Sequence, residues 1–259
     1  MSHIREVRPS AIHLVAAGLP GYPGMAQGGT GRDAVTPRVK ATKEEGRALA
    51  YAVKELFATL QGEGVRAGRA SVFCRFAGCN LWSGREEDRA EAACQFCDTD
   101  FVGLDGAGGG RFADARALAY AIEAAWPGGR AERYVVFTGG EPLLQLDATL
   151  IEAVHARGFE AAVETNGTLA APPGLDWITV SPKAGAPWRL RAGSELKLVY
   201  PQVGLEPDAL PEDLRFAHRW LQPMDGPDQV ANTAATVAYC LVHPGWRLSL
   251  QTHKLIGIP

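Results

Sequence analysis

From residue 51 onward, short apolar runs alternate with stretches in which apolar positions recur every three to four residues. The short runs predict strands, because four to eight apolar or alternating residues suit a pleated sheet. They lie at residues 71–76, 134–138, 160–164, 177–180, 196–200, 216–221 and 248–251. The periodic stretches predict helices at residues 113–125, 143–157 and 229–242, with a shorter one at 208–214. Strands that alternate with helices form βαβ units, so this pattern predicts a mainly parallel sheet.

The number of strands limits the architecture. A closed barrel of this kind needs eight parallel strands, and the chain offers fewer. We therefore expect an α/β fold built as an open, partial β/α barrel with about six core parallel strands. Unusual polar residues follow almost every predicted strand, and the carboxyl ends of parallel strands share one edge. Loops are polar in most proteins, so this clustering supports a site at that edge without establishing one.

Residues 1–49 do not share this pattern. Prolines and glycines interrupt them, and neither a helical nor a strand period is sustained. An apolar stretch at residues 11–19 follows Arg5 and Arg8, but the cleavage site of a signal peptide is poorly matched. We expect residues 1–49 to be an N-terminal extension, either flexible or a non-native start, and residues 50–259 to form the functional domain.

Composition and charge exclude several classes of protein. The formal net charge is −3 and charged residues make up 21%, which argues against a basic nucleic-acid-binding surface and against a disordered chain. No apolar run approaches the roughly 18 residues that cross a bilayer, so we expect a cytoplasmic protein that contacts neither membrane nor nucleic acid. Glycine is enriched, at 30 of 259 residues, which predicts backbone positions that turn sharply or approach a ligand.

Three of the five cysteines are spaced for metal binding. Cys79, Cys94 and Cys97 form C-x14-C-x2-C, and three thiolates can hold a [4Fe–4S] cluster while one iron stays open. A set that adds Cys74 resembles a zinc ribbon, although Cys74 lies inside a predicted strand. Buried thiols without a metal are a third interpretation. We expect Cys240 to pack against its helix's neighbours, as free cysteines commonly do.

An ordered set of motifs resembles radical S-adenosylmethionine (SAM) enzymes, and among them the 7-carboxy-7-deazaguanine synthase family. The usual first gap of the cysteine motif is three residues, and a gap widened to 14 is known in this branch. The resemblance covers about residues 51–259, which include the three cysteines. It is carried by residues 52–64, the CRFAGCNLW run at 74–82, CDT at 97–99, TGGEP at 138–142, ETNG at 164–167, SPK at 181–183, QPMD at 222–225, Thr252-His253-Lys254 and the final proline.

The resemblance implies the radical SAM type of partial barrel and three cofactors. These are a [4Fe–4S] cluster on Cys79, Cys94 and Cys97, SAM, and Mg²⁺ bound by Thr99. The implied SAM contacts are Phe96, Gly139, Gly140, Glu141, Glu164, Ser181, Pro182, Lys183, Gln222, Pro223, Met224 and Asp225. Simpler alternatives remain for some of them. Glu141 suits the start of a helix, and Phe96 suits a core.

The implied substrate is 6-carboxy-5,6,7,8-tetrahydropterin. The implied substrate contacts are Leu60, Gln61, Gly62, Glu63, Arg75, Thr138, His253 and Pro259, with Glu63 and Arg75 as catalytic residues. The planar fork of Arg75 suits the substrate carboxylate. The terminal carboxylate of Pro259 would fold into the site, and the apolar residues before it favour docking over the fraying that is usual for chain ends.

The implied activity is that of a carbon–nitrogen lyase in the biosynthesis of 7-deazapurines and queuosine precursors, upstream of tRNA modification. Radical ring contraction and loss of ammonia would yield 7-carboxy-7-deazaguanine. The family further implies a homodimer and a flavodoxin-like electron donor. Two alternatives stay open: an activase that abstracts hydrogen from a glycine of a partner protein, and a zinc-ribbon binding module without catalysis.

Overall fold

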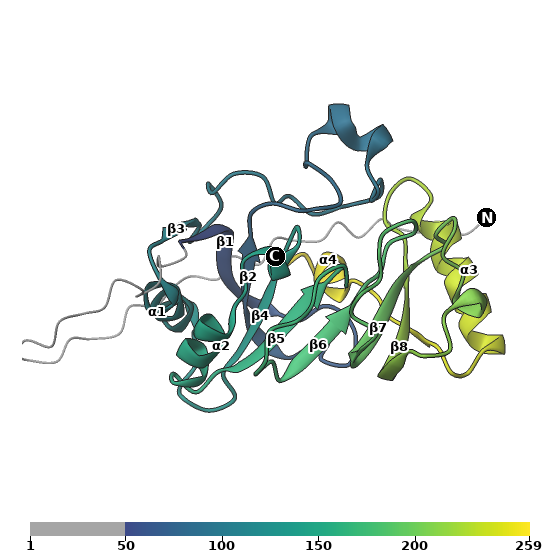
Figure 1. Ribbon diagram of the computed structural model, residues 1–259. Coiled ribbons are helices and arrows are strands. Elements are labelled where there is room, and N and C mark those ends of the chain that lie inside the picture. Colours follow the sequence, from purple (N-terminus) through teal and green to yellow (C-terminus); the bar gives the residue numbers. More distant parts are fainter. Residues whose placement is uncertain (1–49) are drawn as a thin grey trace, which may run out of the picture. The chain divides into compact units, whose positions relative to one another are not determined.

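A nine-stranded sheet organises residues 50–259, which are the residues that this computed structural model describes. The strand order is β3-β1-β2-β4-β5-β6-β7-β8-β9 (Figure 1). The strands are β1 (Tyr51–Leu60), β2 (Ala70–Phe76), β3 (Gly110–Phe112), β4 (Tyr134–Gly139), β5 (Glu160–Thr165), β6 (Trp177–Val180), β7 (Ala192–Tyr200), β8 (Arg215–Pro223) and β9 (Arg247–Leu248). The helices are α1 (Ala115–Ala125), α2 (Ala148–His155), α3 (Gln229–Val242) and α4 (Thr252–Ile256), with short 3-10 helices η1 (Glu86–Glu91), η2 (Pro142–Leu144) and η3 (Pro207–Ala209).

Seven neighbouring strands, β2 and β4 to β9, run parallel to one another. Only the two strands at one edge, β1 and β3, pair antiparallel with their neighbours. The expected α/β architecture with a mainly parallel, open sheet is thereby confirmed. The carboxyl ends of the parallel strands lie at one edge, which is where the predicted functional residues should meet.

The helices cover one face of the sheet. Helices α1 and α2 pack against the main hydrophobic core under β1, β2, β4 and β5, and α3 packs against a second core under β7 and β8 (Figure 1). Asp114 and Asp147 begin α1 and α2 as N-caps, each accepting a backbone N–H at 2.8 Å. The alternate side chains of the strands point to the opposite face, which carries a small apolar cluster of Tyr134, Val136 and Ala162 as well as polar groups.

The two sides of the open sheet meet through the chain's end. The loop after β1 contacts the segment after β9, where Gly64 N–H donates to Ser249 Oγ at 3.0 Å. Thr252 N–H donates to Gly62 C=O at 3.0 Å, and the Thr252 hydroxyl donates to the same carbonyl at 2.9 Å. Polar contacts therefore close the gap that the missing barrel strands would fill.

Several elements differ from the sequence-based prediction. Strand β1 was not predicted, because its alanine, lysine, glutamate and leucine residues prefer helices; pairing with β2 over most of its length overrides that preference. The helix predicted at 143–157 divides into η2 and α2, since Asp147 caps α2. The predicted helix at 208–214 and strand at 248–251 shorten to η3 and β9. Helix α3 has the bounds predicted for it.

The expected extension at residues 1–49 lies outside the described residues. Within residues 50–259, no helix combines the length and the apolar character that a membrane span requires.

Candidate functional site

A cavity of about 320 Å³ opens at the carboxyl edge of the parallel strands. It brings together most of the residues that the sequence singled out, although they come from many separate segments. The predicted residues that line it are Gln61, Glu63, Arg75, Cys79, Cys94, Phe96, Cys97, Thr99, Thr138, Gly139, Gly140, Glu164, Ser181, Lys183, Gln222, Pro223, Asp225 and His253.

Six predicted site residues do not line this cavity. They are Leu60, Gly62, Glu141, Pro182, Met224 and Pro259. Leu60 ends β1 and is partly exposed. Gly62 lies directly under His253, since a Cβ on Gly62 would come within 2.0 Å of His253 Nδ1. Met224 is held through its backbone, whose N–H donates to Tyr200 C=O at 2.8 Å.

The loop after β2 presents the three cysteines of the motif to the cavity. Arg89, in the long insert of the motif, donates to the carbonyls of Gln95 at 2.9 Å and Cys97 at 3.1 Å, and its guanidinium stacks on the Trp82 ring. The insert thus carries the cation that fixes the backbone around the C-x2-C pair. This use of Arg89 could not be predicted from the sequence, since an arginine in a polar loop is common.

The thiols of Cys94 and Cys97 form a coupled pair. The hydrogen bond between them lowers the pKa of Cys97 and raises the pKa of Cys94, which burial raises further. Burial also raises the pKa of Cys79. Lys183 lies close enough for its positive charge to favour both thiolates of the pair. Three soft sulfur donors beside a cation form a donor set that suits an iron–sulfur cluster.

The other two cysteines lie elsewhere. Cys74 is fully buried in the main hydrophobic core, on the helix-covered side of β2. Cys240 packs from α3 against the second core. A four-cysteine zinc ribbon that includes Cys74 is therefore not assembled. Within residues 50–259, no group of three or more His, Cys, Asp or Glu side chains is arranged to hold a single metal ion.

Gly139 and Gly140 permit close packing between β4 and the cysteine loop. Gly139 has φ +136°, and a Cβ on Gly140 would lie 2.2 Å from Gly78 O and 2.6 Å from the Cβ of Cys79. The sequence suggested that these glycines make room for a ligand. The structure adds that they make room for the backbone beside Cys79.

Glu141 is completely buried and bonded within the protein. Its carboxylate accepts hydrogen bonds from the Thr165 hydroxyl at 2.7 Å, Asn166 N–H at 2.8 Å and Leu143 N–H at 2.9 Å. Burial raises its pKa, although these hydrogen bonds oppose the rise. The carboxylate begins η2, which is the helix-start alternative considered above, and joins that turn to the loop after β5.

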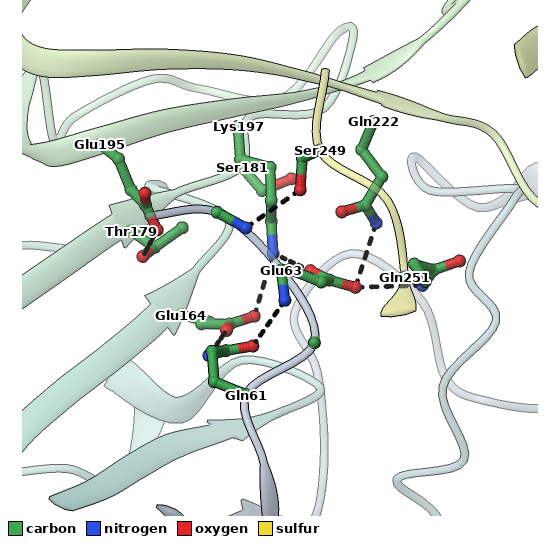
Figure 2. Close-up of polar contacts among 12 residues, drawn as sticks. Gln61, Glu63, Glu164, Thr179, Ser181, Glu195, Lys197, Gln222, Ser249 and Gln251 are labelled. Carbon is green, nitrogen blue, oxygen red and sulfur yellow. Dashed lines mark hydrogen bonds and ion pairs between the residues drawn. The ribbon is translucent and has the colours of Figure 1, made fainter. Parts of the chain in front are cut away.

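A buried lysine on β7, Lys197, connects two predicted site residues and was missed from the sequence. Its ammonium pairs with Glu63 and, at 3.1 Å, with Glu164 (Figure 2). Burial acts to lower the Lys197 pKa, but the two carboxylates outweigh it and hold the pKa above its usual range. A lone lysine inside the otherwise apolar run at residues 196–200 was the signal that could have identified it.

Glutamine side chains complete the contacts of these carboxylates. Gln61 donates to Glu164 at 2.9 Å, while Gln222 and Gln251 donate to Glu63 at 3.2 and 3.1 Å (Figure 2). Gln61 and Glu63 follow β1, and Gln222 ends β8, so the network joins both sides of the open sheet.

Arg75 faces the same cavity from β2. Its Nε donates to Glu55 of β1 at 2.6 Å, and both side chains are mostly buried. Glu55 also lines the cavity and was not predicted. By bonding the inner nitrogen, Glu55 orients the guanidinium fork and offsets its charge.

Lys183 lies on the SAM side of the predicted site. Its ammonium donates to Ser181 C=O at 2.6 Å and Ser181 Oγ at 2.9 Å, and it lies 5.9 Å from the centre of the Phe96 ring. Burial lowers its pKa. Thr99 also lines the cavity, two residues beyond Cys97.

The chain's end docks beside the cavity through polar contacts. Lys254 of α4 pairs with Asp98 and Asp225, and the Thr59 hydroxyl donates to Pro259 O at 2.6 Å. Leu255 and Ile256 are 69% and 62% exposed, so the apolar residues that suggested docking do not provide it.

The chain is similar to known proteins. No family model matches the chain. Among curated proteins, the 7-carboxy-7-deazaguanine synthase of Bordetella pertussis is 68% identical over 211 residues, covering 82% of this chain and 100% of the relative. That of Bradyrhizobium diazoefficiens is 65% identical over 210 residues, covering 81% of this chain and 100% of the relative.

A crystal structure gives the same family. The fold is similar to QueE from Escherichia coli, with a TM-score of 0.58 and 26% identity, covering 78% of this chain and 93% of that one. The cavity, its three cysteines and the full-length similarity to these relatives agree, and the chain belongs to the 7-carboxy-7-deazaguanine synthase family.

Proposed function

We propose that this protein is a radical SAM lyase that converts 6-carboxy-5,6,7,8-tetrahydropterin to 7-carboxy-7-deazaguanine with loss of ammonia. One observation carries the proposal beyond family membership. The C-x14-C-x2-C cysteines line the same cavity as Gln61, Glu63 and Arg75, which offer complementary groups for a small polar heterocycle.

Cys79, Cys94 and Cys97 would hold the [4Fe–4S] cluster, and the open iron would bind SAM. When bound, the reduced cluster and SAM supply the carbon-centred radical that abstracts hydrogen from the substrate. The chain's own contribution is to position these groups and exclude water. Packing of Gly140 against Cys79 fixes the cysteine loop relative to β4.

Most of the side chains proposed to contact SAM lie at the ends of β5, β6 and β8, and Phe96 lies in the cysteine loop. Glu164 can accept hydrogen bonds from ribose hydroxyls. Ser181 and Lys183 offer a hydroxyl and a cation, and the Phe96 ring offers a flat apolar surface for a base. Gln222, Pro223 and Asp225 would form the remaining wall.

The substrate would bind on the side of β1, β2 and α4. Arg75 would bind the substrate carboxylate, because a guanidinium fork matches that group. Gln61 and Glu63 would read the ring edge, where an amide and a carboxylate complement N–H and C=O groups. Thr138 and His253 line the same side of the proposed site.

We further propose that Mg²⁺ assists the reaction and that Thr99 is its protein ligand. Mg²⁺ generally keeps several waters and binds substrate oxygens, so one hydroxyl can suffice when the substrate supplies the rest. The ion would orient the substrate and stabilise the negative charge that develops during ring contraction. A homodimer and a flavodoxin-like electron donor complete the proposal by family resemblance.

The test uses anaerobically reconstituted, full-length protein. Iron and sulfide are quantified first, and the reduced protein is then incubated with SAM, Mg²⁺ and the carboxypterin. We expect about four irons per chain and a product with the mass of 7-carboxy-7-deazaguanine. A full cluster with SAM cleavage but no deazapurine would refute the lyase assignment. Stoichiometric zinc in place of iron would refute the radical chemistry. Omission of Mg²⁺ after chelation tests the metal separately.

A further inference from the structure

Lys197 occupies the junction between the two halves of the proposed site. It lies on β7, whereas Glu164 lies on β5 and Glu63 on the loop after β1 (Figure 2). Strand β6 separates β5 from β7. The lysine side chain therefore crosses the neighbouring strand to reach Glu164 and also reaches a segment from the opposite side of the sheet.

Within residues 50–259, Lys197 supplies the one ammonium that pairs with these two carboxylates. Their other close partners are neutral amides, from Gln61 on Glu164 and from Gln222 and Gln251 on Glu63. Lys197 is 5% exposed, so solvent screens the cluster weakly. Two carboxylates that face one another without a cation cannot both stay ionised at little cost.

We propose that Lys197 is a positioning residue that couples the substrate half of the site to the SAM half by pairing with both Glu63 and Glu164 and holding their carboxylates in orientation. This inference rests on the proposed function, which assigns Glu63 to the pterin edge and Glu164 to SAM. An orientation change at either carboxylate is transmitted to the other through the shared ammonium. Substrate and SAM should therefore bind interdependently.

Other charged groups around this cluster have their own partners. Glu195, the nearest further carboxylate on β7, accepts from the Thr179 hydroxyl at 2.8 Å and Val65 N–H at 3.0 Å. Lys183 is bonded to Ser181. The pKa of Tyr134 is raised chiefly by burial, and the nearby charge of Glu164 raises it further. The remaining titratable groups that line the cavity, apart from the cysteine thiols, are Glu55, Arg75, Asp98, Asp100, Asp225, His253 and Lys254.

The first experiment compares wild type with Lys197→Met as a function of pH. Without the ammonium, Glu63 and Glu164 repel one another, and one carboxyl holds its proton toward neutral pH. We expect kcat/KM for the carboxypterin to fall about 100-fold at pH 6.5 and less than about 10-fold at pH 8.5. In Lys197→Arg, kcat/KM should fall on the acidic side at the same pH as in wild type.

A variant that also removes one carboxylate tests whether repulsion between Glu63 and Glu164 causes this effect. The double variant Lys197→Met/Glu164→Gln removes the repelling charge, so its acidic limb should return to the wild-type position although its activity stays low. Lys54 provides a matched control, because it is a similarly buried lysine paired with Asp100 and Asp105 and does not line the cavity. Lys54→Met should reduce thermal stability and leave the acidic limb in place.

A readout independent of turnover uses protein labelled with carbon-13 at the glutamate carboxyls, with the cluster oxidised. Lys197→Met should show a carboxyl resonance that titrates near neutral pH, absent in wild type and in the double variant. Such a result would support the inference even if the carboxypterin proved not to be the substrate. Parallel pH profiles for wild type and Lys197→Met, or no new titrating carboxyl, would overturn it and leave Lys197 a packing residue.

Discussion

Lys254 donates a hydrogen bond to Asp98 at 2.6 Å, across 156 residues of sequence. Asp98 directly follows Cys97, the last cysteine of the motif, while Lys254 belongs to the C-terminal helix α4. The same ammonium reaches Asp225 at 2.5 Å, in the loop after β8. One side chain therefore joins the cysteine loop, the proposed SAM wall and the chain's end.

Replacing Lys254 by methionine should loosen this junction. Because the contact lies at the cavity rim and not at the thiols, we expect KM for the carboxypterin to rise about 5- to 10-fold, equivalent to roughly 1 to 1.4 kcal/mol, while iron content stays at the wild-type value. Steady-state kinetics and iron analysis on the same preparation measure both. Arg219→Met, which removes an exposed cation from β8, is the control. Equal effects of the two variants would contradict the prediction.

The stability contributed by this contact should depend on pH in a defined direction. The hydrogen bond from Lys254 lowers the pKa of Asp225 below its usual value. A lowered pKa stabilises the folded chain above the unfolded pKa, and the stabilisation disappears as pH falls through the folded one. The difference in unfolding temperature between wild type and Lys254→Met should therefore be constant near neutral pH. It should disappear below about pH 4. A difference that grows on acidification would refute this.

Gly140→Ala should damage the cysteine loop. The added Cβ would meet Gly78 O at 2.2 Å and the Cβ of Cys79 at 2.6 Å, so the loop must shift. We expect a loss of about 1–3 kcal/mol in unfolding free energy and substoichiometric iron after reconstitution. Gly129→Ala is the matched control, because an added Cβ on Gly129 would meet no atom within 4 Å. Full iron content in Gly140→Ala would show that the loop tolerates the displacement.

Cys74→Ala and Cys79→Ala separate the two cysteine sets. Cys74 is fully buried in the hydrophobic core, so its loss should lower stability by about 1 kcal/mol and leave cluster iron near wild type. Cys79→Ala should abolish a stable [4Fe–4S] cluster. Iron and sulfide content and the visible absorption of the anaerobic proteins distinguish them. Loss of the cluster in Cys74→Ala would mean that the ligand set was chosen wrongly.

Deleting Pro259 tests the role of the chain end. Its O atom accepts a hydrogen bond from the Thr59 hydroxyl near the end of β1, on the proposed substrate side. We expect weaker turnover of the carboxypterin with reductive SAM cleavage retained, because Pro259 is bonded to Thr59 on the substrate side and not to the proposed SAM wall. Thr59→Val, which removes the donor, should produce a smaller change in the same direction. Unchanged kinetics in the deletion would make the tail a passive end.

The strand and helix pattern predicted the parallel sheet because each βα unit is specified locally. The bounds of α3 and the runs that became β2, β4, β5 and β6 could be placed from apolar spacing alone. The clustering of polar residues after the strands then predicted one site at one edge, and the cavity contains most of them.

The partners of those residues could not be predicted, because pairing across the sheet depends on strand order and register. Lys197 looked like an interruption of an apolar run until Glu63 and Glu164 were placed around it. Glu55 acquired its role only through its register opposite Arg75. Glu141 lies in a conspicuous motif, yet hydrogen bonds from Thr165 and Asn166, at the end of the neighbouring strand β5, occupy its carboxylate.

The contacts between the loop after β1 and the segment after β9 also determine when the pocket can form during synthesis of the chain. Chains are synthesised from the N-terminus, so the sheet and the cysteine loop exist before α4 does. Gln251, Thr252 and Lys254 follow all nine strands in the sequence, and they supply contacts to Glu63, Gly62 and Asp98. A nascent or C-terminally truncated chain can therefore present the three thiols while its pocket is still unfinished. Completion of the pocket therefore depends on α4, which follows all nine strands in the sequence.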